Sequence, residues 1–265
     1  IKFMEAVDQF ERIINDTLLL RLERMTEDEL VGTADRPGLL DRYFSLSEEG
    51  HASLEDIQLG ADLVRVGDHR LCLHTLSDTE DLPTRVSTDG RYERLSTDRS
   101  DCRLSFASPV GLLLSCNHIY NQYLFIEDSD ATLERFEKQA RNMHSLARYS
   151  RSNQINEEWI QEYLNIRAHF NVLAWSSEAD QLRQIKNDVG SALALMECKP
   201  RHNTIDTATL YWAGIPGNAA DFPSEESFYT FIEPALCFFT AETNYKDSLS
   251  PFGIKMADRL SGKPI

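Results

Sequence analysis

A single Gly-Lys pair, Gly262-Lys263, is the place where this sequence comes nearest to a phosphate-binding motif. A nucleotide-binding loop has the form GxxxxGK[ST], in which backbone amides surround the phosphates and the lysine meets the terminal ones. Here Pro264 stands where the motif needs a hydroxyl, and Ala257 where it needs its first glycine. The pair therefore favours a turn, and we expect no ATP site in these 265 residues.

Two Cys-x-His pairs could supply metal ligands, because residues two apart on a strand face the same side. They are Cys72 with His74 and Cys116 with His118. Structural zinc sites more often use CxxC spacing, and a lone cysteine is more often a small core residue. The sequence therefore predicts no metal site.

Groups for acid–base or nucleophilic catalysis are also present, but not in a catalytic pattern. Ser115 and His118 are close in sequence, yet no GxSxG turn surrounds any serine. The acid pairs lie where helices are expected to begin, and helix starts attract acids for electrostatic reasons; they are Glu127-Asp128, Glu157-Glu158 and Glu225-Glu226. We expect no catalytic residue, and hence a chain that is not an enzyme by itself.

Basic side chains gather in and just beyond the helix that we expect over 132–149. Such a face, with Tyr149 near enough to stack on a base, could contact single-stranded nucleic acid. The residues concerned are Arg135, Lys138, Arg141, Arg148 and Arg151. Glu134 and Glu137 lie among them, so an ordinary solvated face is the favoured interpretation.

The elements that must position these groups begin with an amphipathic helix. Apolar residues recur three or four apart from Phe3 to Met25, with charged residues between them; they are Phe3, Val7, Phe10, Ile14, Leu18, Leu22 and Met25. Glycine, proline, aspartate and serine then predict a loop over 27–55, with at most one helical turn.

Short apolar runs dominate the next part of the chain. Gly67-Asp68 between the runs 63–66 and 71–74 predicts a hairpin. We predict further strands at 110–115 and 119–126, and a polar, mobile stretch at 78–100.

From residue 119 strands and helices alternate. We predict helices over 132–149, from Asn156, and after a capping pair Ser177 and Asp180, with strands at 168–175 and 207–212. The segment 214–218 ends this unit, and Pro223 begins a short helix that carries Phe228, Phe231 and Ile232.

The fold class that these elements predict is α+β, with mostly antiparallel sheets and βαβ-type, ferredoxin-like helices on one face, preceded by the amphipathic helix. We divide the chain into a helical segment (1–56), the α+β domain (57–218) and a helix with linker (219–265).

Composition limits the function further. The 43 acidic and 27 basic residues give a formal charge of −16, which opposes attraction to nucleic acid or an anionic membrane. Five scattered cysteines without a CxxC fit a reducing cytoplasm, and no apolar run is long enough to span a membrane. The first residue is Ile1 rather than methionine, so we expect the chain to be a piece of a longer protein.

Several stretches of the sequence resemble the TraG-type conjugation ATPases of Bacteroidetes conjugative transposons. The resemblance is densest after residue 110 and is carried by three segments: Asn117-His118-Ile119-Tyr120-Asn121-Gln122-Tyr123, Leu210-Tyr211-Trp212-Ala213-Gly214-Ile215-Pro216-Gly217-Asn218, and Ser250-Pro251-Phe252-Gly253 followed by Ser261-Gly262-Lys263-Pro264. These ATPases are similar to the VirB-type motors of type IV secretion, in which an α+β domain precedes a RecA-like ATPase domain. The resemblance implies that ATP and Mg²⁺ bind in that second domain, beyond Ile265.

The same resemblance implies a role for the part that is present. It would be a non-catalytic docking and regulatory domain in the cytoplasm, at the inner face of the bacterial inner membrane. Its partners would be inner-membrane components of the secretion channel and neighbouring ATPase subunits of a hexamer. From the amphipathic spacing of the first helix, we expect Phe3, Phe10 and Ile14 to be the docking residues. The alternative is a single-stranded nucleic-acid-binding module of the transfer machinery.

Overall fold

A computed structural model describes most of the chain, in two compact units, Ile1–Ile57 and Gln58–Ile265. The described residues are 2–17, 21–47, 56–60, 63–91, 96–126, 165–203, 205–240 and 242. The helices predicted over 132–149 and from Asn156 lie outside them.

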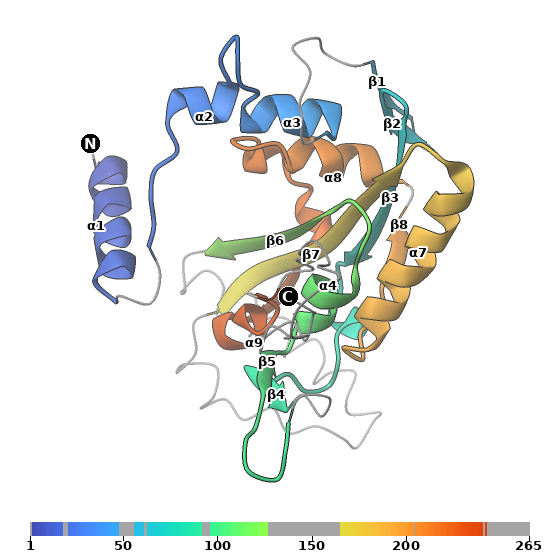
Figure 1. The fold of residues 1–265 in the computed structure, drawn as a ribbon. Helices are drawn as coiled ribbons and strands as arrows, with labels where there is room; N and C mark the ends of the chain where they lie inside the picture. Colours follow the sequence, from blue (N-terminus) through green and yellow to red (C-terminus); the bar gives the residue numbers. More distant parts are fainter. Residues whose placement is uncertain are drawn as a thin grey trace, which may run out of the picture. The chain divides into compact units, whose positions relative to one another are not determined.

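The first unit contains α1 (Lys2–Asp16), α2 (Glu27–Val31) and α3 (Leu39–Ser45) (Figure 1). The predicted amphipathic helix is therefore confirmed, but its extension to Met25 is wrong. The Asn15 side chain bonds the backbone of Leu22, accepting its N–H at 2.6 Å and donating to its carbonyl at 3.1 Å. Arg24 also bonds Asp8 and Glu11. These contacts fold residues 21–25 back along α1, which apolar spacing alone does not reveal.

The segment 27–55, predicted as a loop, contains two short helices. Thr26 caps α2, because its Oγ1 accepts the Glu29 N–H at 3.3 Å while the Glu29 carboxylate accepts the Thr26 N–H at 2.8 Å. The chain then reverses through a bridge between Gly32 and Pro37 before α3 begins. At Gly32, with φ of +92°, a Cβ would lie 2.5 Å from the Gly38 nitrogen. The turn therefore requires glycine there.

The second unit is built on one antiparallel sheet with strand order β1-β2-β3-β7-β6, in which β8 also pairs with β3 and β9 with β7 (Figure 1). Its strands are β1 (Ile57–Leu59), β2 (Val64–Val66), β3 (His69–Leu76), β6 (His118–Ile126), β7 (Asn165–Ser176), β8 (Arg201–Asn203) and β9 (Phe228–Phe231). A separate pair is formed by β4 (Asp89–Arg91) and β5 (Arg103–Ser105). The predicted hairpin is confirmed, since Val66 and His69 pair across Gly67-Asp68.

The α+β class is confirmed, and one helix gives the sheet its βαβ character. The long strand β7 leads into α7 (Ala179–Ala194), which leads into β8. Both strands are antiparallel to β3 and lie on its two sides, so they run parallel to each other with β3 between them. The predicted caps of α7 are wrong: the N-cap is Glu178, whose N–H donates to Ser176 Oγ at 3.1 Å.

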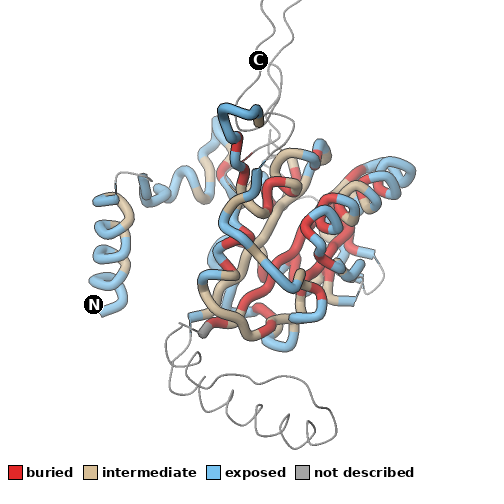
Figure 2. The backbone as a smooth tube through the Cα atoms, turned by 90° about the horizontal axis from the view of Figure 1, so that it is seen from below, coloured by how far each residue is buried: buried red, intermediate tan, exposed pale blue. Residues whose placement is uncertain are grey.

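Alternate residues of the central strands face two different layers. The even-numbered side of β7 faces a core to which α7, α4 (Ser108–Leu113) and α9 (Ile232–Leu236) contribute. Figure 2 shows that most of the buried residues, in red, gather within the second unit. That core includes Ala168, Phe170, Val172, Ala174, Leu182, Val189, Val110 and Phe238. The odd-numbered side carries Leu173, His169 and Asn171, all buried.

Two predicted strands are helices. The segment 110–115 lies largely in α4, where Pro109 occupies the first turn and Val110 and Leu114 are buried four residues apart. The segment 207–212 forms α8 (Thr207–Ala213), whose residues Thr207, Leu210 and Tyr211 are buried at helical spacing. A short apolar run does not distinguish a strand from a buried helix by periodicity alone.

The described C-terminal part also differs from the prediction. A 3₁₀ turn, Ser224–Glu226, is followed by β9, so Phe228 and Phe231 belong to a strand and only Ile232 begins the helix α9. The polar stretch 78–100 includes a 3₁₀ turn, Thr79–Asp81, and β4; its mobility stays a prediction. Over the parts of the chain that the structure covers, no helix combines the length and apolar character needed to cross a membrane.

Candidate functional site

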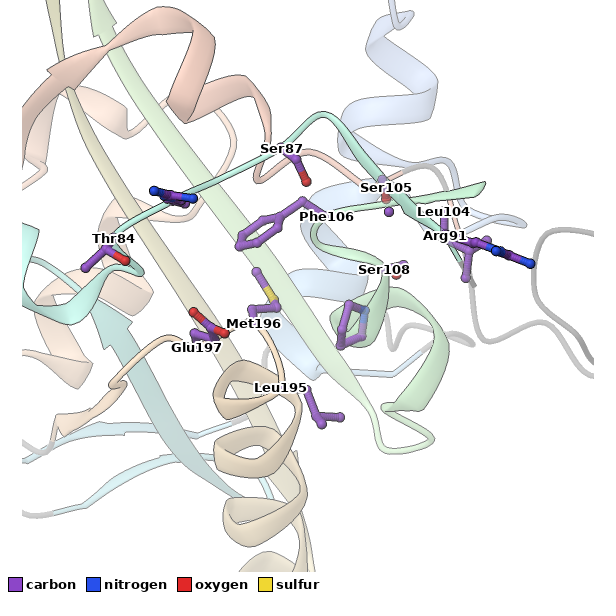
Figure 3. Close-up of a pocket in the computed structure, with 13 residues that line it drawn as sticks. Thr84, Ser87, Arg91, Leu104, Ser105, Phe106, Ser108, Leu195, Met196 and Glu197 are labelled. Atoms are coloured by element: carbon purple, nitrogen blue, oxygen red, sulfur yellow. The ribbon is translucent and has the colours of Figure 1, made fainter. Parts of the chain in front are cut away.

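An open groove of about 440 Å³ lies between the β4–β5 pair, the start of α4 and the end of α7 (Figure 3). The side chains of Phe106 and Met196 lie towards one another in its middle, and the hydroxyls of Thr84 and Ser87 lie on one side. The Phe106 ring is fixed by an edge-on contact with Phe238, at 5.4 Å between ring centroids. The floor is therefore apolar, while the rim is polar.

The charged side chains of the groove have opposite signs. Arg85 and Arg91 contribute guanidinium groups, and Arg91 is already paired with Asp101 at 3.3 Å. Glu197 contributes a carboxylate at the end of α7. The groove therefore combines an apolar floor with side chains of both charges at its rim.

Ser105, at the edge of the groove, is held by the buried Glu242. The Glu242 carboxylate accepts the Ser105 N–H at 2.8 Å, the Ser105 hydroxyl, and the Thr240 hydroxyl at 2.8 Å. Burial raises the pKa of Glu242, but these hydrogen bonds outweigh it and lower the pKa overall. A carboxylate with a lowered pKa is a weak base, so this contact is a structural clamp rather than a nucleophile with its base.

Removing this clamp is expected to lower the stability of the fold measurably. Replacing Glu242 with glutamine removes the negative charge that three donors share, and we expect the free energy of unfolding to fall by about 1–3 kcal/mol. Urea unfolding measures it. Glu225→Gln, at an exposed position, is the matched control and should change stability by less than about 0.5 kcal/mol. Equal stabilities of the two variants would show that the clamp contributes nothing.

A buried polar chain crosses the other face of the sheet. His169 Nδ1 lies 2.6 Å from the Glu226 carbonyl oxygen, so this nitrogen carries the proton and donates it. His169 Nε2 then accepts from the Asn171 amide at 2.9 Å, and Asn171 Oδ1 accepts from Asn121 at 3.0 Å. Burial lowers the pKa of His169 to about 4. The histidine is therefore neutral at pH 7 and holds β6, β7 and the Glu226 turn together.

The Cys-x-His pairs are not brought together as a metal centre. Cys72 lies opposite Ala174 on one side of β7, and His118 lies opposite the same Ala174 on its other side. Among the described residues no three histidine, cysteine or acidic side chains group closely enough to hold a metal ion. Burial raises the pKa of Cys72 to about 11, which keeps this thiol protonated.

The remaining candidate residues are placed as follows. His118 Nδ1 lies 2.9 Å from the Cys116 carbonyl, which fixes its ring within the strand. Burial raises the pKa of Glu226, and the nearby Asp206 carboxylate raises it further. The acid pairs at 127–128 and 157–158, and the basic residues from Arg135 to Arg151, lie outside the described residues.

The apolar face of α1, where the sequence predicts the docking residues, is largely exposed. Phe3 is 77% exposed, Phe10 59% and Ile13 56%, while Ile14 is half-buried. No residue of α1 is buried. Ile13 was not among the predicted docking residues, although its place beside Phe10 on the helix could have indicated it.

No protein-family model matches this chain, and no curated protein matches it.

Proposed function

We propose that this chain is a non-catalytic docking and regulatory domain of a conjugative-transfer ATPase of type IV secretion. The observation that carries the docking role is the exposure of Phe3, Phe10 and Ile13 along one side of α1. Aromatic side chains exposed together on a helix are typical of a surface that another protein covers. The assignment to conjugative transfer rests on the sequence resemblance, and places the partner among the inner-membrane components of the channel.

The charges of α1 indicate what kind of surface it fits. Its polar side carries four acidic residues against two basic ones; these are Glu5, Asp8, Glu11 and Asp16, with Lys2 and Arg12. An acidic amphipathic helix is repelled by anionic lipid headgroups, whereas membrane-surface helices are usually basic. We therefore infer an apolar groove on a partner protein, and not a membrane surface, as the site that receives α1.

Nucleic acid is a weaker candidate for the partner. The net charge of −16 opposes it. The two functions differ in their response to salt, because phosphate contacts lose affinity steeply as salt rises and apolar docking does not. A binding constant that falls steeply between 50 and 200 mM salt would favour the nucleic-acid function.

Placing a charge in the apolar face tests the docking role. Phe10→Asp should reduce binding to detergent-extracted channel complex by at least about tenfold, because a carboxylate would be buried without a partner. Gln9→Asp adds the same charge on the polar side of α1 and should leave binding unchanged. Both positions are exposed, so both variants should fold, which circular dichroism checks. Undiminished binding of Phe10→Asp means that α1 is not the contact.

A further inference from the structure

The outer strand of the sheet, β6, is paired along one edge only within the part of the chain that the structure describes. Its residues pair with β7 in an unbroken register from His118↔Ala174 to Ile126↔Ile166. The two extra strands of the sheet join elsewhere, β8 on β3 and β9 on β7. Figure 1 shows β6 at the end of the strand order beside β7. One long edge of β6 is thus left without a described strand.

The residues that direct their backbone groups to this outer edge follow from the register. Asn117 accepts the Trp175 N–H at 3.3 Å, so the odd-numbered residues of this stretch bond β7. In an antiparallel pair the intervening residues point both backbone groups away from the partner strand. The outward residues are therefore His118, Tyr120, Gln122, Leu124 and Ile126.

This edge lacks the features that usually prevent strands from associating. Edge strands are commonly protected by proline, lysine, other charges or a bulge. The sequence HIYNQYLFI contains no proline and no residue with a formal charge at pH 7, and its register with β7 is unbroken. We propose that β6 is a self-association surface, which pairs antiparallel with β6 of a second copy of this chain.

A second copy fits this edge because the strand is complementary to itself. A two-fold axis through Gln122 overlaps all nine residues of the two strands. Tyr120 then lies opposite Leu124, and Ile119 opposite Phe125, which are favourable aromatic–aliphatic pairs. Each copy carries a formal charge of −16, so contacts between acidic parts of the surface are repulsive. The side chains of β6 carry no formal charge and do not add to this repulsion. This contact does not depend on the proposed docking function of α1.

A proline at the centre of the strand tests the proposal. Gln122 directs its N–H away from β7, so Gln122→Pro blocks the outer edge without removing a bond to β7. The Gln122 side chain donates to the Phe238 carbonyl at 2.7 Å, and Gln122→Ala loses that same bond while keeping the N–H. In sedimentation velocity the wild type and Gln122→Ala should reach twice the 30.3 kDa chain mass as concentration rises. The dimer of Gln122→Pro should be at least about tenfold weaker.

A covalent cross-link supplies a second measurement that does not depend on the proline variant folding. Two residues paired across the axis have Cα atoms about 5.5 Å apart, which a disulfide can span. Mild oxidation of Gln122→Cys should therefore give a covalent dimer, whereas Gln184→Cys on exposed α7 should not. A wild-type chain that stays monomeric at roughly 100 µM overturns the proposal. So does a Gln122→Pro variant that dimerises as well as Gln122→Ala.

Discussion

Replacing Phe170 with alanine is expected to lower the free energy of unfolding by about 3–5 kcal/mol, the usual cost of truncating a buried aromatic residue. Phe170 lies near the middle of β7 and is 1% exposed. Its ring stacks on Phe238 with 4.4 Å between centroids and contacts Phe228 at 6.0 Å. The substitution therefore leaves a cavity where the sheet, β9 and the end of α9 meet, and urea unfolding measures its cost.

Phe170→Ala should also weaken the hydrogen bond that Tyr120 donates to the Phe238 carbonyl. The Tyr120 hydroxyl and the Gln122 amide both donate to the Phe238 carbonyl, so loosening Phe238 weakens the contact of β6 with this layer. Phe239→Ala is the matched control, because it removes the same kind of side chain at a position that directly follows Phe238 but is 58% exposed. It should cost less than about 0.5 kcal/mol. Similar losses in the two variants would contradict the packing described for Phe170.

Acidification from pH 7 to pH 5 is the second change with a large expected effect. Burial lowers the pKa of His74 to about 4, assisted by His202 and Lys186, and burial likewise lowers the pKa of His169 to about 4. In the unfolded chain both take up a proton below about pH 6.5. The unfolded state then binds more protons than the folded state, so stability present above pH 6.5 is lost as pH falls towards 4. The loss by pH 5 is about 2 kcal/mol for each histidine.

His74 is the cleaner position for testing this pH dependence. Its buried Nδ1 has no hydrogen-bond partner among the described residues, and its ring packs edge-on against His202 at 5.4 Å. His74→Phe keeps an aromatic ring and removes the titration, so the loss of stability between pH 7 and pH 5 should shrink by about 2 kcal/mol. Substituting His169 would instead leave Asn171 without its acceptor at every pH. Parallel stability curves for wild type and His74→Phe would rule out the titration of His74 as a cause.

The sequence was sufficient to predict those helices, strands and turns that are determined by their own local residues. Gly67-Asp68 determined the hairpin between β2 and β3, because few other dipeptides form so tight a turn. The short, mostly apolar run 168–175 predicted most of β7, and amphipathic spacing did the same for α1. The α+β class followed from these elements, and the polar residues His169 and Asn171 could have been placed on one face by their spacing of two.

Tertiary structure decided the elements and contacts that depend on distant residues. The runs 110–115 and 207–212 are helices because their buried residues pack at helical spacing against the sheet, which a short apolar run does not specify. The Glu242 clamp joins residues 137 apart in sequence. No local pattern predicts it, because a carboxylate's partner depends on which strand the chain meets after folding. The sequence by itself thus determined the fold class and the amphipathic helix, whereas only the assembled sheet decided which polar groups are buried together and which described strand lies outermost.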